Sequence, residues 1–143
     1  MNRFAFAFFT ATVLASGAAA QTLDASKLAG RWSGTGEFFK EDLQRTIGSV
    51  GFEAVFKADN SGTGRVGGAI LQDVRVTTRR DHIEVNAGIA GTIGSNPALA
   101  KHRLVLLVTA LTDSTLEAEF HLKSNSIFDP TMREGHVVMT RVR

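Results

Sequence analysis

The stretch that decides the fold class is Leu116-Glu117-Ala118-Glu119-Phe120-His121-Leu122-Lys123, in which apolar and polar residues alternate without a break. Successive side chains of a β-strand point to opposite faces, so residues two apart share a face. The stretch therefore predicts a strand with one apolar face, made by Leu116, Ala118, Phe120 and Leu122, and one polar face.

The same period of two recurs along most of the chain on both sides of this stretch. It predicts further strands over residues 32–38, 50–57, 64–71, 74–79, 83–89, 104–111 and 137–142. Between the third and fourth of these, Gln72-Asp73 is a weak turn signal that marks either a turn or only a bend. Residues 91–102 and 128–135 have no period and are expected to be loops.

These strands predict an all-β protein with one antiparallel sheet. Such a long sheet must pack on a second sheet or curl up on itself to remove its edges. We expect a single up-and-down β-barrel of about eight strands, with a sandwich as the alternative. Asp24 to Gly30 reads as one short helical turn before the first strand, because Asp24 can cap it and Gly30 can end it. No helix is expected to cover the sheet.

The first 20 residues have the pattern of a cleavable export signal. Arg3 supplies a positive charge, Phe4 to Ala15 is apolar, and Ala18-Ala19-Ala20 suits cleavage before Gln21. The apolar stretch is shorter than the ~20 residues that a membrane-spanning helix needs. We expect residues 1–20 to be removed, residues 21–143 to form one domain without a membrane span, and the protein to be periplasmic or secreted.

Composition excludes several classes of protein. The 143 residues include no Cys and only two Pro, and 43% are hydrophobic. These values argue against a disulfide scaffold, a lipid-anchored cysteine and a charge-dominated disordered chain. Loss of Arg3 with the signal lowers the formal charge from +2 to +1, which is too small an excess to predict a nucleic-acid partner.

Leu28-Ala29-Gly30-Arg31-Trp32, placed behind a helical turn at the start of the first strand, resembles the Gly-x-Trp signature of lipocalins and related calycin barrels. In that superfamily the Trp lies at the closed end of the barrel, and a basic residue of the last strand packs over it. The resemblance implies a lipocalin-like barrel over residues 21–143, with Arg141 or Arg143 over Trp32. A cation over an indole face contributes about 0.5–2 kcal/mol.

Two weaker resemblances imply other functions. Gly30-Arg31-Trp32-Ser33-Gly34-Thr35-Gly36 is similar to the opening of nitrobindin-type haem barrels, in which case His136 would be the axial ligand. Size, export and the Leu-Ala-Gly-x-Trp opening are also similar to small periplasmic inhibitors of secreted metalloproteases. That similarity implies binding through the arm Gln21 to Ala25, although those inhibitors usually carry a disulfide, which a chain without Cys lacks.

The apolar face of the strands predicts the wall of an interior binding site. The residues expected to line it are Trp32, Phe38, Phe52, Phe56, Ile83, Val85, Leu106 and Phe120, with Arg141 at one end. Small residues also point inward in this interpretation, namely Gly34, Gly36, Ala54, Gly68 and Ala87; they either leave room for a ligand or allow close backbone approach. The leading hypothesis is an exported barrel that binds a small apolar or amphipathic molecule. The alternative is a barrel with a filled core, in which Trp32 is a plug and an exported protein is the partner.

No catalytic, metal or cofactor site is expected. The four His have no zinc-ligand spacing and are interpreted as solvated, with His136 the one candidate ligand for haem or a metal. Glu117 and Glu119 fall on a polar face, and no Ser lies in a Gly-x-Ser-x-Gly elbow. Arg65, Arg75, Arg79 and Arg80 are interpreted as a solvated face rather than a site for an anionic partner.

Overall fold

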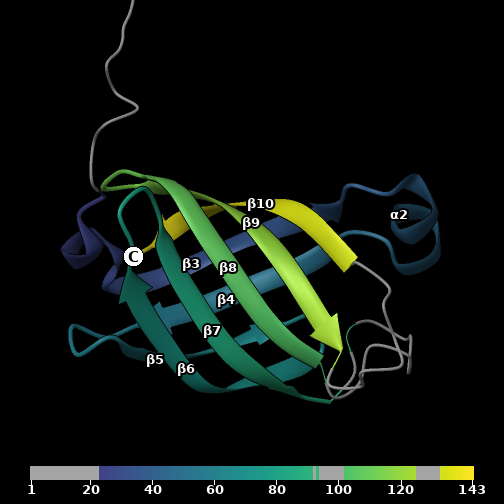
Figure 1. Ribbon diagram of the computed structural model, residues 1–143, viewed down its shortest axis with the longest axis horizontal. Helices are drawn as coiled ribbons and strands as arrows, with labels where there is room; N and C mark the ends of the chain where they lie inside the picture. The colour runs from purple at the N-terminus through teal and green to yellow at the C-terminus, as the bar shows by residue number, and fades with distance from the viewer. Residues whose placement is uncertain (1–22, 92, 94–101, 125–132) are drawn as a thin grey trace, which may run out of the picture.

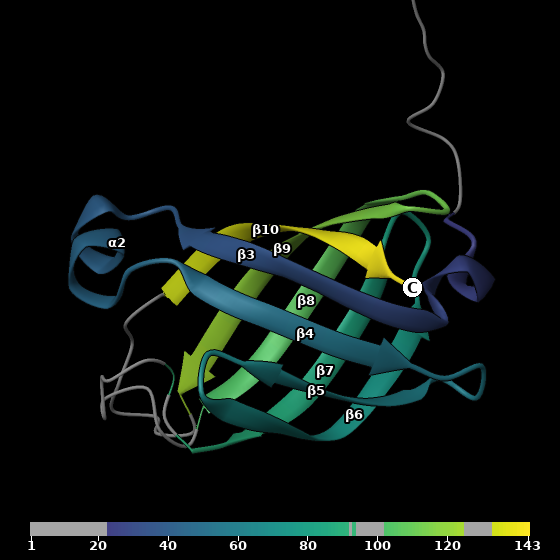
Figure 2. The same cartoon turned by 180° about the vertical axis from the view of Figure 1, so that it is seen from behind.

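Eight antiparallel strands close into a barrel in the computed structural model, which describes residues 23–91, 93, 102–124 and 133–143. The strands are Gly30–Phe38 (β3), Val50–Phe56 (β4), Ser61–Val66 (β5), Ala69–Thr78 (β6), Ile83–Ala90 (β7), His102–Leu111 (β8), Thr115–Ser124 (β9) and Arg133–Val142 (β10). Each strand pairs with the next along the chain, and β10 pairs with β3 (Figures 1 and 2). The predicted up-and-down barrel is confirmed, and the sandwich is not formed. The expected signal, residues 1–20, lies outside the described residues.

The last strand closes the barrel by pairing on both sides. In β10, Val137 lies opposite Gly36 of β3 and also opposite Ala118 of β9. Because every strand has two neighbours, no sheet edge is left among the eight strands. The alternation of β9 is seen in its burial, with Leu116, Ala118, Phe120 and Leu122 all inside.

The third and fourth strands meet earlier in the chain than expected, and of the two alternatives for Gln72-Asp73 the bend is the one that forms. The turn lies at Gly67-Gly68, where Gly67 has a φ of 62°, a value that favours glycine. Gln72-Asp73 lies within β6 as a bend: the register with β7 shifts between Gln72 and Arg75, and Asp73 has a φ of 53°. β8 and β10 also begin earlier than expected, at His102 and Arg133.

A short helix that was not predicted from the sequence lies between β3 and β4. It is the seven-residue α2 (Glu41–Ile47), with acidic residues in its first turn and Arg45 in its last. Leu43 and Ile47, one turn apart, are half-buried and pack against the core. Figure 1 places α2 at the end of the barrel opposite the C-terminus.

The expected helical turn before the first strand is present as the 3-10 turn η2 (Ala25–Leu28). The Asp24 side chain accepts hydrogen bonds from the Ser26 backbone N–H and the Ser26 hydroxyl, at 3.0 and 2.6 Å. These bonds lower the pKa of Asp24, with the hydroxyl bond the larger cause. The turn places Leu28 in the core at the end of the barrel where Trp32 lies.

Candidate functional site

The predicted interior residues line one continuous apolar core. Trp32, Phe38, Phe52, Phe56, Ile83, Val85, Leu106 and Phe120 are all buried and all belong to it. They come from five strands, β3, β4, β7, β8 and β9, because inward positions recur every second residue around the barrel. The structure thus brings together the eight apolar residues that the sequence predicted.

Three of these rings form an aromatic cluster. The Phe120 ring lies 5.3 Å from the Phe38 ring in an edge-on arrangement and 5.1 Å from the Phe52 ring. Such pairs contribute about 0.5–1.5 kcal/mol beyond the area they bury. A Cβ on Gly36 would lie 2.7 Å from Phe52 and 2.9 Å from Phe120. Gly36 therefore makes room for these rings rather than for a ligand.

The other small residues divide into two groups. Ala54 and Ala87 are buried on the inner face, as predicted. Gly34 also points inward, where Met139 and the Val138 carbonyl occupy the space of its missing side chain. Gly68 was predicted to point inward, but it is exposed in the turn between β5 and β6.

One end of the barrel is closed by a clamp between Trp32 and Arg141. The Arg141 guanidinium carbon lies 4.4 Å from the centre of the Trp32 ring system. The Trp32 indole N–H donates to the Leu28 carbonyl at 2.8 Å, so its one polar atom is satisfied in the core. Of the two basic residues implied by the resemblance to lipocalins, Arg141 is therefore the one that packs over Trp32.

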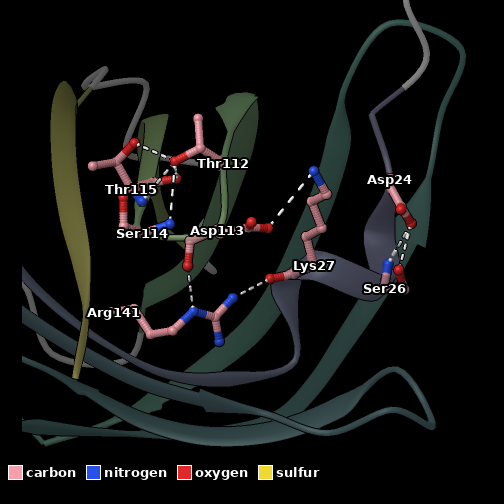
Figure 3. Close-up of polar contacts among 8 residues, drawn as sticks. All are labelled: Asp24, Ser26, Lys27, Thr112, Asp113, Ser114, Thr115 and Arg141. Carbon is pink, nitrogen blue, oxygen red and sulfur yellow. Dashed lines mark hydrogen bonds and ion pairs between the residues drawn. The ribbon is translucent and has the colours of Figure 1, made fainter. Parts of the chain in front are cut away.

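Arg141 also joins its own strand to two other segments of backbone at this end, the turn before β9 and the segment before β3. Its Nε donates to the Asp113 carbonyl at 2.6 Å, Nη1 to the Ala29 carbonyl at 2.7 Å and Nη2 to the Lys27 carbonyl at 2.6 Å. Figure 3 shows Arg141 between the turn that carries Asp113 and the turn that carries Lys27. Each guanidinium nitrogen donates to a backbone carbonyl, so Arg141 ties this end of the barrel together.

The opposite end of the barrel carries polar residues on its inner side. His102 is only 3% exposed, and its Nε2 lies 3.3 Å from Arg133 Nη1. Arginine has donors only, so Nε2 is the acceptor of this contact. Ser124 lies opposite His102 in the ladder between β8 and β9. His102 was expected to be a solvated loop residue, which was wrong because β8 begins with it and turns it inward.

The remaining histidines face away from the interior. His136 is on the outer face of β10, with Nε2 3.6 Å from Glu117 Oε1, and so does not reach into the barrel as a haem ligand would. His121 Nδ1 lies 2.6 Å from Glu134 Oε2, and His82 Nδ1 lies 2.7 Å from Asp81 Oδ1. Within the described residues, no group of three or more His, Asp or Glu side chains is arranged to hold a metal ion.

The arm implied by the resemblance to protease inhibitors is only partly described. Residues 21 and 22 lie outside the described residues, and Leu23 and Ala25 are half-buried and pack against the core. No helix in the described part of the chain has the length and apolar character to cross a membrane.

Comparison with known proteins supports the fold and no more. No protein-family model matches the chain, and no curated protein matches it. Among solved structures, that of EF1p2_mFAP2b bound to DFHBI is similar, with a TM-score of 0.57 and 14% sequence identity over 82% of this chain and 96% of that chain. At this level of identity the likeness shows a shared barrel architecture.

Proposed function

We propose that the protein is an exported, lipocalin-like barrel that binds a small apolar or amphipathic molecule in its interior. The observation that carries the proposal is the asymmetry of the barrel. The Trp32 and Arg141 clamp closes one end, whereas the other end has a short amphipathic helix and the inward-facing pair His102 and Arg133. A continuous apolar wall lies between these two ends.

The distribution of side-chain size favours one side of the interior for the ligand. The rings of Phe38, Phe52 and Phe120 fill the side made by β3, β4 and β9. Across the barrel, β6 and β7 contribute no aromatic ring, and there the small buried residues Ala69 and Ala87 lie among aliphatic side chains such as Leu71 and Ile83. An eight-stranded barrel is just wide enough for a side-chain core or one small ligand. We place the apolar part of the ligand beside Ala69 and Ala87, with any polar part toward His102 and Arg133.

A titration with paired variants tests the interior site. The probes are 1-anilinonaphthalene-8-sulfonate, an aromatic anion with an apolar body, and DFHBI, which the similar barrel was solved with. Ala69→Phe places a ring in the proposed space, and Ile70→Phe places the same ring on the next, outward-facing residue. We expect binding to the parent chain, loss in Ala69→Phe and retention in Ile70→Phe.

Two results would reject the interior site. One is equal binding by Ala69→Phe and Ile70→Phe, and the other is absence of binding of both probes by the parent chain. If Ala69→Phe does not fold, Ala87→Leu replaces it, because it adds a smaller side chain to the interior from β7. Loss of probe binding in Ala87→Leu would then support the interior site, and retained binding would reject it.

Export is the part of the proposal that rests on residues 1–20 alone. The charge at Arg3, the apolar stretch and the Ala18-Ala19-Ala20 pattern support it. The intact mass of the protein from the periplasmic or culture fraction should correspond to a chain that begins at Gln21. A full-length chain confined to the cytosol would contradict export without affecting the interior site.

A further inference from the structure

A groove of about 420 Å³ lies on the outside of the barrel, over β3, β4 and β5. Its walls come from outward-facing residues that are neighbours across the strands. Arg31 lies opposite Val142 of β10 and Val55 of β4, and Val55 lies opposite Thr63 of β5. The next row of neighbours runs from Ser33 through Glu53 to Arg65. The groove is thus separate from the interior.

Short side chains make this part of the surface concave. Ser33 and Thr63 line the groove, and Gly64 and Ala54 lie beneath it. A second hollow of about 190 Å³ adjoins it where Gly51 has no side chain, and the two share Ser33, Glu53 and Arg65. A Cβ on Gly51 would have no atom within 4 Å. The depression therefore follows from residue size along three adjacent strands.

The charged side chains of the groove have no partner among the described residues. Within the described part of the chain, no hydrogen bond or ion pair engages Arg31, Arg65 or Glu53, although Glu53 and Arg65 are cross-strand neighbours. Some exposed arginines outside the groove are engaged, since Arg75 contacts Asp73 at 3.3 Å and Arg79 contacts Glu84 at 3.6 Å, whereas Arg103 on β8 has no ion pair with a described residue. Two guanidinium groups and one carboxylate leave the groove with an excess of positive charge.

We propose that this groove binds a small organic anion, a carboxylate or phosphate attached to an apolar body. A guanidinium group presents a planar fork of donors that matches the oxygens of either anion. Val55 and Val142 supply apolar wall, and 40% of Val142 is exposed. The volume falls within the range of about 300–1,000 Å³ that is usual for small-molecule sites. Arg31 and Arg65 hold the anionic group, and the two valines contact the apolar body.

Substitution of Glu53 should affect anion binding in the direction opposite to substitution of Arg65. The Glu53 carboxylate stands in the same row as Arg65 and repels a bound anion. Glu53→Gln should therefore tighten anion binding, and Arg65→Gln should weaken it. A merely structural role for either residue would not produce this opposite pair of effects.

The test is a titration of the isotope-labelled protein followed by amide NMR. The probes are benzoate and phenyl phosphate, which separate the two anionic groups, and neutral benzamide. We expect the anions, but not benzamide, to shift the amides of Arg31, Ser33, Thr63 and Arg65. Loss of a charged hydrogen bond at Arg65→Gln should weaken binding about tenfold or more. Arg103→Gln is the control with the same charge change, because Arg103 is exposed on β8, away from the groove.

Three results would overturn the proposal. The first is no shift in the groove at about 10 mM of either anion, a concentration above the dissociation constant of even a weak site. The second is shifts confined to interior residues, which would reassign the anion to the interior. The third is an equal loss of affinity in Arg65→Gln and Arg103→Gln, which would indicate general charge attraction. Failure of the interior site leaves this test unchanged, because the groove lies on the outer face.

Discussion

Replacement of Arg141 by Met should open the closed end of the barrel and lower its stability. Methionine keeps much of the length of the side chain but has no donor for the three carbonyls and no charge over Trp32. The three donated bonds, at 2.6–2.7 Å, join the last strand to the turn before β9 and to the segment before β3. The change removes one residue that connects three parts of the chain that are distant in sequence.

The magnitude follows from the exposure of each contact. Hydrogen bonds from charged groups contribute about 1.5–3 kcal/mol each, but groups that water reaches lose less. The carbonyls of Asp113 and Lys27 lie in exposed contacts, and the bond to Ala29 is the part-buried one. Adding about 1 kcal/mol for the cation over the indole, we expect a total loss of about 2–4 kcal/mol.

Urea unfolding measures this loss, with Arg103→Met as the matched control. Arg103 is exposed on the outer face of β8 and makes no ion pair with any described residue, so its replacement should change the free energy of unfolding by less than about 0.5 kcal/mol. Arg141→Lys, which keeps the charge but not the fork of donors, should lie between the parent and Arg141→Met. A loss below about 1 kcal/mol in Arg141→Met would refute the clamp as the closing element.

Three further predictions concern the core and the first turn. Trp32→Ala should cost about 3–5 kcal/mol of unfolding free energy in the same assay, and a cost below about 1 kcal/mol would contradict its place in the core. Gly36→Ala should lower the free energy of unfolding by about 1–3 kcal/mol, because the new methyl group meets two phenylalanine rings. Gly51→Ala is the control, because its methyl group meets nothing within 4 Å. An equal loss in both variants would show that the rings do not fill the space beside Gly36. Ser26→Ala should raise the pKa of Asp24 toward 3.8, measured by NMR titration of the carboxyl group, because the largest cause of its lowering is the hydroxyl bond. Since the folded pKa is lowered, the stabilisation by Asp24 is present above pH 3.8 and is lost as the pH falls through the folded value; an unchanged pKa in Ser26→Ala would exclude that cause.

The wall of the barrel was predictable because period two fixes the face of each residue. Trp32 and Phe120 were predicted to point inward because they lie on the apolar face of the alternating pattern, and both are buried. The pairing of β10 with β3 joins residues about a hundred positions apart. The alternation within each strand does not specify which strand becomes its neighbour. The Trp32 and Arg141 contact came from the resemblance to lipocalins, and the choice over Arg143 required the structure, in which Arg143 lies beyond the end of β10.

Other features had weak local signals. α2 spans two turns only, and its signal was the spacing of Leu43 and Ile47 after two acidic residues. The polar end of the interior was missed because His102 adjoins a stretch without period, so its face was not fixed by alternation. The outer groove depends on which side chains become neighbours across three strands, and a single strand does not reveal those neighbours.

Occupancy of the interior is tested most directly by native mass spectrometry of the protein purified gently from its own compartment, followed by denaturation and extraction of the same sample. We predict a bound mass that is lost on denaturation and is recovered as a small apolar or amphipathic molecule. The Ala69→Phe chain, prepared in the same way, should not carry that mass, whereas Ile70→Phe should. A bare mass for the parent chain would contradict an interior ligand and would indicate a filled core.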